Sequence, residues 1–590
     1  MVATREGGRL EAGKRRARRA SPTPVEPPAV GASAPRPKPA KSGSRPEPPK
    51  VGARAAGGWI RRLADTSDTI EVRRRLRRLA GQVARGSGNV QRMTFLETEI
   101  AECLDEAAGA GVRDRWQLCE AAAWGLGWMA RTKRAGGSAG GLLERLVQQA
   151  RAAQVSLAGR DTVPARFVLV LARLFRDIEA CRCLEASSVD AVGEELARLV
   201  TAAGAVGLSG AEAVLERVVR WTGVREAGLA TGPLPWDEAA ESRWAAAASA
   251  ALGLLGGRGR ILVGPGRLPA CFSQPLLEAV AGRPRGGVSR AAARTARALS
   301  RGGTNAKCLP RDFHDPEAAV AILRSGWKQG DVRVLLEYRE PLPRLEIAVD
   351  DRVLFAGAWQ WSASADGRPL DAEGAWKVSC WETGRKATFL EIVAPLTGGM
   401  QLERQVVVLP RQRIMMLADA LVPRPGSTAA IQDLRHRACL PLATGLDSDP
   451  EQETREILVS DTRTRCLVLP LALPEWRTAG RGGFAAAADG LVLEQQGAMR
   501  LFAPLWIDCD AARIGRPRTW RQLTVADTRR ILPAHQAVGF RVQAGLEQWL
   551  VYRALDVPRN RTLLGCNVSC EFLVGRVKKS GEVARTLEIQ

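Results

Sequence analysis

Hydrophobic side chains follow a helical period in the first half of the chain. One face of a predicted helix carries four of them at i, i+4, i+7 and i+8, namely Leu96, Ile100, Cys103 and Leu104. Similar segments recur up to about residue 255, and short glycine-containing turns separate them, which favours antiparallel packing of neighbouring helices. The sequence therefore predicts an α-helical domain of helical hairpins over residues 57–255.

Three short motifs indicate where helices of this domain begin. Thr94 and Glu97 have the spacing of a capping box, in which each side chain bonds a free backbone N–H near the helix start. Asp114 and Gln117 repeat that spacing. Pro164 precedes the apolar run ARFVLVLARL, and a proline in the first turn of a helix loses no hydrogen bond. We expect a helix to begin at each motif.

In the second half of the chain the period changes to two. Along one predicted strand Trp376, Val378 and Cys380 fall on one face and Trp381 on the other. Many short segments of this kind follow one another, separated by turn residues, which is typical of a β-sandwich. Helices and strands occupy separate blocks, so we predict a second domain of a different class over residues 316–590.

Two further segments have no strong hydrophobic period. Residues 256–315 are rich in Gly, Arg and Pro, with one amphipathic helix around residues 289–300, and we interpret them as a bridge between the domains. Residues 1–56 carry thirteen Lys and Arg against four Glu, with almost no large apolar side chain. Such a segment cannot bury enough surface to offset the entropy of ordering it, so we predict a disordered basic tail. Whether that tail binds polyanions or is merely solvated remains open.

Composition narrows the range of partners. The formal net charge is +23 at pH 7, which favours nucleic acid, an acidic polysaccharide or an anionic membrane surface as a partner, unless the spread-out arginines simply form a solvated surface.

No apolar run approaches the length of about 18 residues that a spanning helix needs. The basic run GKRRARRAS has no apolar segment after it, so it does not match a secretory signal. None of the twelve cysteines forms a CxxC pair, and free thiols favour a reducing compartment.

The order of these blocks, together with several segments of the β half, resembles the heparinase II/III-like polysaccharide lyases. The segments are DPEAAVAILRSGW (315–327), residues 381–422 and residues 548–577, and the strongest match is LERQV (402–406) with Asp419. The resemblance covers roughly residues 60–590. It implies an incomplete α/α toroid followed by an antiparallel β-sandwich.

The resemblance also implies a chemistry, which this sequence does not reproduce. Such enzymes cleave uronate-containing polysaccharides by β-elimination, with a Tyr or His that removes the C5 proton, a Tyr or His that protonates the leaving oxygen, and Asn, His or Arg groups that neutralise the carboxylate. The turn that usually carries histidines in the family reads REPLPRLE here (339–346), and the whole chain holds three His and two Tyr. We therefore expect binding rather than cleavage.

Five residues are the candidates for a site. His314 lies near the domain boundary between two aspartates, and it is the candidate catalytic residue, with a helix-cap or loop role as the alternative. The candidate substrate-binding residues are Arg339, Arg344, Trp327 and Trp381. Arg is always protonated, so Arg339 and Arg344 can neutralise a carboxylate but cannot act as the base.

Other candidates carry weaker signals. His436 and Cys439 form an H-x-x-C pair, but zinc needs two more ligands and none is near in sequence, so we predict no metal and no cofactor. Trp116, Trp124 and Trp128 share one predicted helix, where a place in the core is the simpler interpretation and sugar stacking is the alternative.

Three functions remain open after the sequence. The first is a heparinase II/III-like protein that binds an acidic polysaccharide with lost or altered lyase activity. The second is an active lyase with an unusual catalytic set. The third is an interaction protein that binds polyanions, including nucleic acid, through its basic tail, although no nucleic-acid-binding motif supports it. A cytoplasmic location is the default in the absence of a signal, whereas the family resemblance allows a periplasmic one. The sequence does not indicate an oligomeric state.

Overall fold

The structure is a computed structural model that describes residues 52–86, 90–132, 138–208, 210–256, 272–282, 287–301, 308–328, 330–349, 352–427, 430–477, 482–528 and 530–590. All of them belong to one unit, Pro48–Gln590. Residues 1–51 of the predicted tail lie outside the described residues. The end of that predicted tail is helical, because the first helix begins at Ala53 rather than at residue 57.

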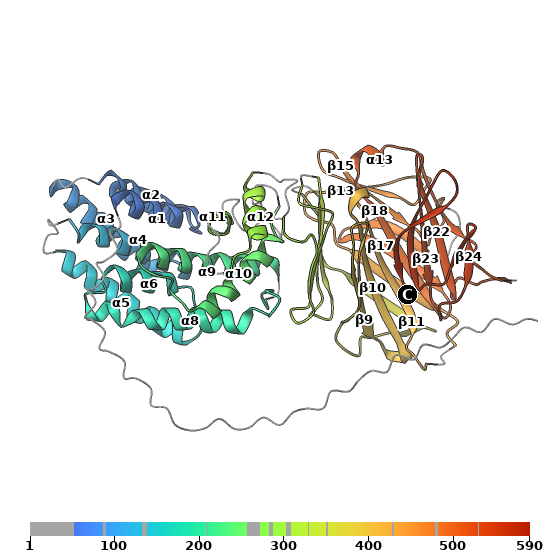
Figure 1. The fold of residues 1–590 in the computed structure, drawn as a ribbon, viewed down its shortest axis with the longest axis horizontal. Coiled ribbons are helices and arrows are strands. Elements are labelled where there is room, and N and C mark those ends of the chain that lie inside the picture. The colour runs from blue at the N-terminus through green and yellow to red at the C-terminus, as the bar shows by residue number, and fades with distance from the viewer. Residues whose placement is uncertain are drawn as a thin grey trace, which may run out of the picture. The chain divides into compact units, whose positions relative to one another are not determined.

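Helices occupy the described residues up to Ser300 (Figure 1). They are α1 (Ala53–Asp65), α2 (Ile70–Arg85), α3 (Val90–Gly109), α4 (Val112–Met129), α5 (Ser138–Ala158), α6 (Ala165–Leu174), α7 (Glu179–Arg182), α8 (Leu184–Leu199), α9 (Ala211–Thr231), α10 (Glu238–Leu252), α11 (Gln274–Ala281) and α12 (Arg290–Ser300). The last two lie in the predicted bridge, where the sequence indicated only the second. Their apolar faces share one core, and no described helix is long and apolar enough to cross a membrane.

The predicted helix starts were partly wrong. Thr94 lies inside α3, and its hydroxyl donates to the carbonyl of Val90 one turn earlier. Asp114 lies in the first turn of α4, but its carboxylate accepts hydrogen bonds from the backbone N–H groups of Asp68 and Thr69. Asp114 therefore holds the two residues that lead into α2, a contact between positions distant in sequence.

Strands occupy the described residues from Phe313 onward and form antiparallel sheets, which confirms the predicted order of a helical half and a β half. The first sheet has the order β1 (Phe313–Asp315), β2 (Val320–Arg324), β3 (Val332–Glu337), β4 (Arg344–Val349) and β5 (Arg352–Ala358). The largest sheet has the order β13 (Asp447–Pro450), β14 (Ile457–Ser460), β15 (Thr464–Pro470), β18 (Leu501–Asp508), β11 (Ile414–Pro423), β10 (Met400–Leu409), β9 (Thr388–Pro395) and β8 (Lys377–Thr383).

Three smaller sheets complete the β half. One has the order β16 (Gly482–Ala487), β17 (Gly490–Gly497), β12 (Leu434–Leu440), β6 (Gln360–Ala365) and β7 (Arg368–Pro369). The next is β19 (Arg518–Leu523), β22 (Ala537–Ala544), β23 (Glu547–Ala554), β26 (Phe572–Val577) and β27 (Val583–Ile589). The last is β21 (Arg530–Ile531), β20 (Ala526–Asp527), β24 (Arg561–Leu563) and β25 (Cys566–Val568), and a short helix, α13 (Ala511–Ile514), follows β18.

The eight-stranded sheet is the centre of the β half, because both of its faces are buried. One face packs against the β1–β5 sheet and the β12-containing sheet, and the other packs against the β22-containing sheet. Alternate side chains of β10 illustrate this, since Val406 belongs to the first core and Val407 to the second. The result is a layered β-sandwich, as predicted.

A β-bulge in β8 corrects the predicted alternation of that strand. The register with β9 shifts between Val378 and Cys380, so the side chains after the bulge exchange faces. Trp381 consequently packs against the same core as Val378, and Cys380 against the other.

Two buried arginines join the β1–β5 sheet to the helices. Arg324 donates to the carbonyls of Gly253 at 2.8 Å and Leu255 at 2.7 Å, and Arg333 donates to that of Leu254 at 3.1 Å. These carbonyls follow the end of α10, where the helix dipole favours a positive charge. The sheet therefore supplies charges that complement a helix terminus of the other half.

Candidate functional site

The helical half contains a cavity of about 330 Å³, which we call the helical groove. Side chains of α1, α4, α6, α9 and α11 line it. The lining residues include Trp59, Arg62, Arg113, Trp116, Glu120, Arg166, Glu216, Arg220, Gly223, Glu226 and Glu278. Charged and aromatic groups thus converge in one concavity, which is typical of ligand sites.

Two tryptophans and two phenylalanines, Phe167 and Phe272, supply the aromatic part of the helical groove. Trp59 is half-buried and stacks on Trp124, with ring centroids 5.6 Å apart and an angle of 5° between the planes. Trp116 stacks on Phe167 at 6.0 Å. Trp124 is fully buried, as the core interpretation predicted, whereas Trp116 combines a buried position with a place in the wall of the groove.

Four carboxylates line the helical groove, and each has an arginine partner. Glu278 pairs with Arg62 at 3.2 Å, Glu216 with Arg113 at 2.8 Å and Glu120 with Arg166 at 2.6 Å. Glu226 pairs with its chain neighbour, Arg225. The acidic side chains of the groove are therefore already neutralised by arginines.

Arg220 differs from these arginines because no described residue forms a hydrogen bond or an ion pair with it. It is half-buried on α9. Burial, together with the positive charges of Arg217 and Arg113, lowers the pKa of Arg220 to about 10. The carboxylates of Asp161 and Glu216 oppose this shift, but neither forms an ion pair with Arg220. The side chain stays protonated at neutral pH, so the groove holds a largely desolvated positive charge without a direct ion-pair partner among the described residues.

Backbone geometry makes room for one of the arginines. A Cβ atom at Gly223 on α9 would lie 2.6 Å from Nη1 of Arg166, which is too close for any real contact. The absence of a side chain at this position lets the guanidinium of Arg166 lie across the helix and reach Glu120.

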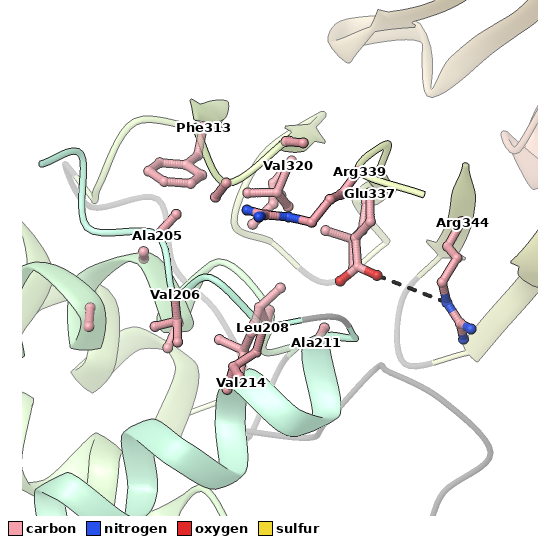
Figure 2. Close-up of a pocket in the computed structure, with 18 of the residues that line it drawn as sticks. Ala205, Val206, Leu208, Ala211, Val214, Phe313, Val320, Glu337, Arg339 and Arg344 are labelled. Carbon is pink, nitrogen blue, oxygen red and sulfur yellow. Dashed lines mark ion pairs between the residues drawn. The ribbon is translucent and has the colours of Figure 1, made fainter. Parts of the chain in front are cut away.

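A second, smaller cavity of about 50 Å³ lies where the helices meet the β1–β5 sheet (Figure 2). Its walls are mostly small apolar side chains such as Val206 and Val320, and the predicted residues Arg339 and Arg344 lie at one side. Arg344 is 4.0 Å from the carboxylate of Glu337. Both predicted arginines therefore line one largely apolar cavity, but the carboxylate of Glu337 lies between them (Figure 2), and Arg339 donates to the carbonyl of Glu317 at 3.0 Å.

Glu337 of this cavity has a structural partner. Its carboxylate accepts the backbone N–H of Gly210, the residue before α9, at 3.1 and 3.2 Å. Burial raises the pKa of Glu337, although Arg344 and this hydrogen bond oppose the shift. A carboxylate at a helix N-terminus is stabilising, so Glu337 caps α9 from the neighbouring sheet.

His314 lies on the other face of the β1–β5 sheet, away from Arg339 and Arg344. Its Nε2 is 2.9 Å from the hydroxyl of Tyr338, and its ring is 4.9 Å from that of Trp381. Burial lowers the pKa of His314, and burial together with Asp315 raises the pKa of Tyr338 far above its usual range. The structure thus groups His314 with Trp381 and a tyrosine.

The aspartates on either side of His314 form their hydrogen bonds with other groups. Asp312 accepts from the backbone N–H of Arg324 and the hydroxyl of Thr388. Asp315 accepts from the hydroxyl of Thr201 and from backbone N–H groups after β1. Both carboxylates therefore stabilise the local fold.

Trp327 is separate from the other predicted site residues. Its Nε1 donates to the carbonyl of Leu309 at 3.0 Å, and the guanidinium of Arg324 lies 4.2 Å from the ring centre. These contacts give Trp327 a packing role at the junction with the helices.

Sequence reasoning missed the helical groove because its residues are far apart in the chain. Arg113 and Arg220 are on different helices, and only the fold brings them near each other. One signal was present, since Arg220 interrupts the apolar run VVRWTGV. Burying a charge within such a run is costly unless the charge is paired.

The chain was compared with family models, curated proteins and solved structures. No family model matches the chain, and no curated protein matches it. Solved structures do match. The chain has the fold of heparinase III.

The matches cover most of each chain at low sequence identity. The chain superposes on a mutant of the heparan sulfate lyase HepC from Pedobacter heparinus with a TM-score of 0.55 and 11% identity, covering 84% of this chain and 85% of that one. The unmutated lyase gives 0.53 and 10%, with 88% and 91% covered. A heparinase III structure gives 0.53 and 11%, with 82% of each chain covered. The heparinase resemblance is confirmed at the level of the fold.

Proposed function

We propose that this chain binds an acidic polysaccharide in the helical groove, with its β-elimination activity lost or altered. The observation that carries the proposal is Arg220, a desolvated arginine without a partner among the described residues, in a groove whose own carboxylates are already paired. The likeness in fold to a heparan sulfate lyase supports a polysaccharide as the class of ligand.

The chemistry of an acidic sugar fits this groove. A carboxylate or sulfate group gives a guanidinium two parallel charge-assisted hydrogen bonds, which are about twice as strong as neutral ones. The apolar face of a sugar ring suits an aromatic wall, for which the half-buried Trp59 is the accessible side chain, whereas Trp116 is 6% exposed and stacks on Phe167. The bound anion would be the direct ion-pair partner that Arg220 lacks among the described residues.

The groove does not offer the expected base for β-elimination. The described residues that line it include no His and no Tyr, and all five such residues of the chain lie elsewhere. His436 is buried against Asp419, and Tyr552 is fully buried beside Arg561. Arginine cannot accept a proton, so binding is better supported than cleavage.

A comparison of ligands tests this proposal. Binding of the full chain to heparan sulfate should be measurable and should weaken as salt increases, because salt screens charge. The matched ligand is the same polysaccharide after desulfation and reduction of its carboxyl groups, which keeps the sugar backbone and removes the charge. We expect the neutral form not to compete. Equal affinity for both forms would contradict the proposal.

A second candidate, an active lyase with an unusual catalytic set, is favoured by one observation, which is the contact between His314 and Tyr338. Incubation with uronate-containing polysaccharides should show whether the ultraviolet absorbance of unsaturated uronates appears, and we expect none. If turnover appears, His314→Ala should abolish it. Turnover that survives this change would place the chemistry elsewhere.

A further inference from the structure

Cys466 and Cys509 face each other across two neighbouring strands of the eight-stranded sheet. Leu467 of β15 pairs with Asp508 of β18, so the next antiparallel pair is Cys466 with Cys509. The N–H of Cys509 donates to the carbonyl of Arg413 at 3.0 Å, which continues the pairing of β18 with β11 by one residue. Cys509 therefore directly follows the last residue of β18 and keeps a backbone hydrogen bond to the neighbouring chain segment.

The two thiols also lie on the same side of the sheet. Cys466 is fully buried and Cys509 is 5% exposed, both in the core between the eight-stranded sheet and its neighbours. Cys466 also acts on the pKa of the Cys509 thiol, which is consistent with neighbouring sulfur atoms. Paired residues of antiparallel strands have Cα atoms about 4.5 or 5.5 Å apart, and disulfides span about 4.4–6.8 Å, so the backbone already has the required spacing.

From this juxtaposition we propose that Cys466 and Cys509 form a cross-strand disulfide. Each thiol loses one hydrogen and an S–S bond forms. The two electrons and two protons pass to a disulfide donor, such as oxidised glutathione or an oxidised thiol–disulfide oxidoreductase, which becomes the corresponding pair of thiols. The bond would join β15 to β18 and close the segment between them, which includes β16 and β17.

The setting indicates a structural bond rather than a reversible switch. Thiol exchange needs a thiolate that a disulfide donor can reach. The neighbouring thiol of Cys466, together with burial, raises the pKa of Cys509 well above its usual value, and both residues are buried. Oxidation must therefore occur while the chain folds, and a bond once formed is protected from reductants in the folded protein.

Cys439 provides a matched control on another sheet. It is buried, with 2% of its surface exposed, but the residues opposite it are Val492 on β17 and Gln360 on β6. It is a buried strand cysteine without a thiol opposite, and it should remain reduced when the chain is refolded with oxidised glutathione.

Peptide mapping of the full chain tests the proposal. The protein is unfolded, reduced, refolded with a mixture of reduced and oxidised glutathione, alkylated without reduction and digested with trypsin. The two cysteines fall in separate peptides with one cysteine each, residues 466–477 and 501–513. We expect these peptides to be joined, with a mass lower than their sum by two hydrogen atoms, and the Cys439 peptide to be alkylated. Recovery of both peptides as alkylated thiols, or joined to other cysteines, would overturn the proposal.

Variants extend the test without depending on stability alone. In Cys466→Ala the 501–513 peptide should be recovered alkylated, and in Cys509→Ala the 466–477 peptide should be, whereas Cys439→Ala should leave the cross-link in place. Prior reduction should lower the thermal midpoint of the wild-type chain by a few degrees and leave that of Cys466→Ala unchanged. A midpoint that responds equally to reduction in both proteins would contradict a structural bond at this pair.

Discussion

Asp419 and Arg404 form a buried ion pair that gives the most recognisable sequence motif a structural role. Arg404 donates to both oxygens of Asp419, at 2.8 and 3.0 Å, across the β10–β11 pair. His436 lies 3.0 Å from the same carboxylate, and Trp359 supplies a carbonyl acceptor and a ring face to Arg404. Each buried charge of this group has a partner, and any one of these charges would be costly to bury alone.

Asp419→Asn should be strongly destabilising, by about 3–5 kcal/mol, because it leaves Arg404 buried without its counter-charge. Although burial opposes the shift, Arg404 and His436 hold the pKa of Asp419 well below its usual range. Its stabilisation is therefore present above the unfolded pKa of about 3.9 and is lost as pH falls through the folded pKa. Urea unfolding at neutral pH measures the loss.

The control for that change is Asp105→Asn, which removes the same charge from an exposed pair with Arg145. Exposed pairs contribute little, so its midpoint should barely move. Equal loss of stability in the two variants would show that burial of the Asp419 pair is not what makes it important.

At the scale of single elements, the sequence predicted most helices and strands but not their irregularities. The hydrophobic period located α3, because Leu96, Ile100, Cys103 and Leu104 all face the core. It did not indicate the bulge in β8, which depends on the register with β9, nor the contact of Asp114 with the residues before α2, which depends on tertiary structure. These features depend on neighbours that a local pattern does not contain.

Gly223→Ala on α9 tests how an element shapes the helical groove. The added methyl group meets the guanidinium end of Arg166, a flexible side chain, so the fold should survive while Arg166 moves away from Glu120. We expect weaker binding of heparan sulfate, measured by calorimetry.

Gly193→Ala on α8 is the matched control, because nothing lies within 4 Å of the added Cβ. It should leave affinity unchanged and stabilise the chain by about 0.5–1 kcal/mol, as Ala replaces Gly inside a helix. If Gly193→Ala lowered the affinity as much as Gly223→Ala, the loss of affinity could not be attributed to the helical groove.

At the scale of the whole molecule, the shift of period predicted a helical half and a β half, and the resemblance predicted how the two are built. The candidate site was not predicted. The chosen residues divide among the small cavity with Arg339, the sheet face with His314 and the junction with Trp327. The groove instead depends on side chains that only the packing of several helices brings together.

Deletion of residues 1–51 tests the predicted basic tail. If the tail contacts polyanions, the truncated chain should bind heparan sulfate more weakly and with a shallower dependence on salt, because fewer charges are screened. Binding that depends on Arg220 should remain. An unchanged affinity and salt dependence would leave the solvated tail as the better interpretation.

The most direct test of the central claim compares the affinity for heparan sulfate of Arg220→Ala with that of Arg182→Ala. The second change removes the same charge from an exposed site on α7. A hydrogen-bonded charge in a desolvated site contributes about 1.5–3 kcal/mol, so we predict about tenfold weaker binding or more for Arg220→Ala, and none for Arg182→Ala. Because Arg220 lacks a partner among the described residues, its removal should not lower the unfolding midpoint. Equal affinities of the two variants would contradict binding of an acidic polysaccharide in the helical groove.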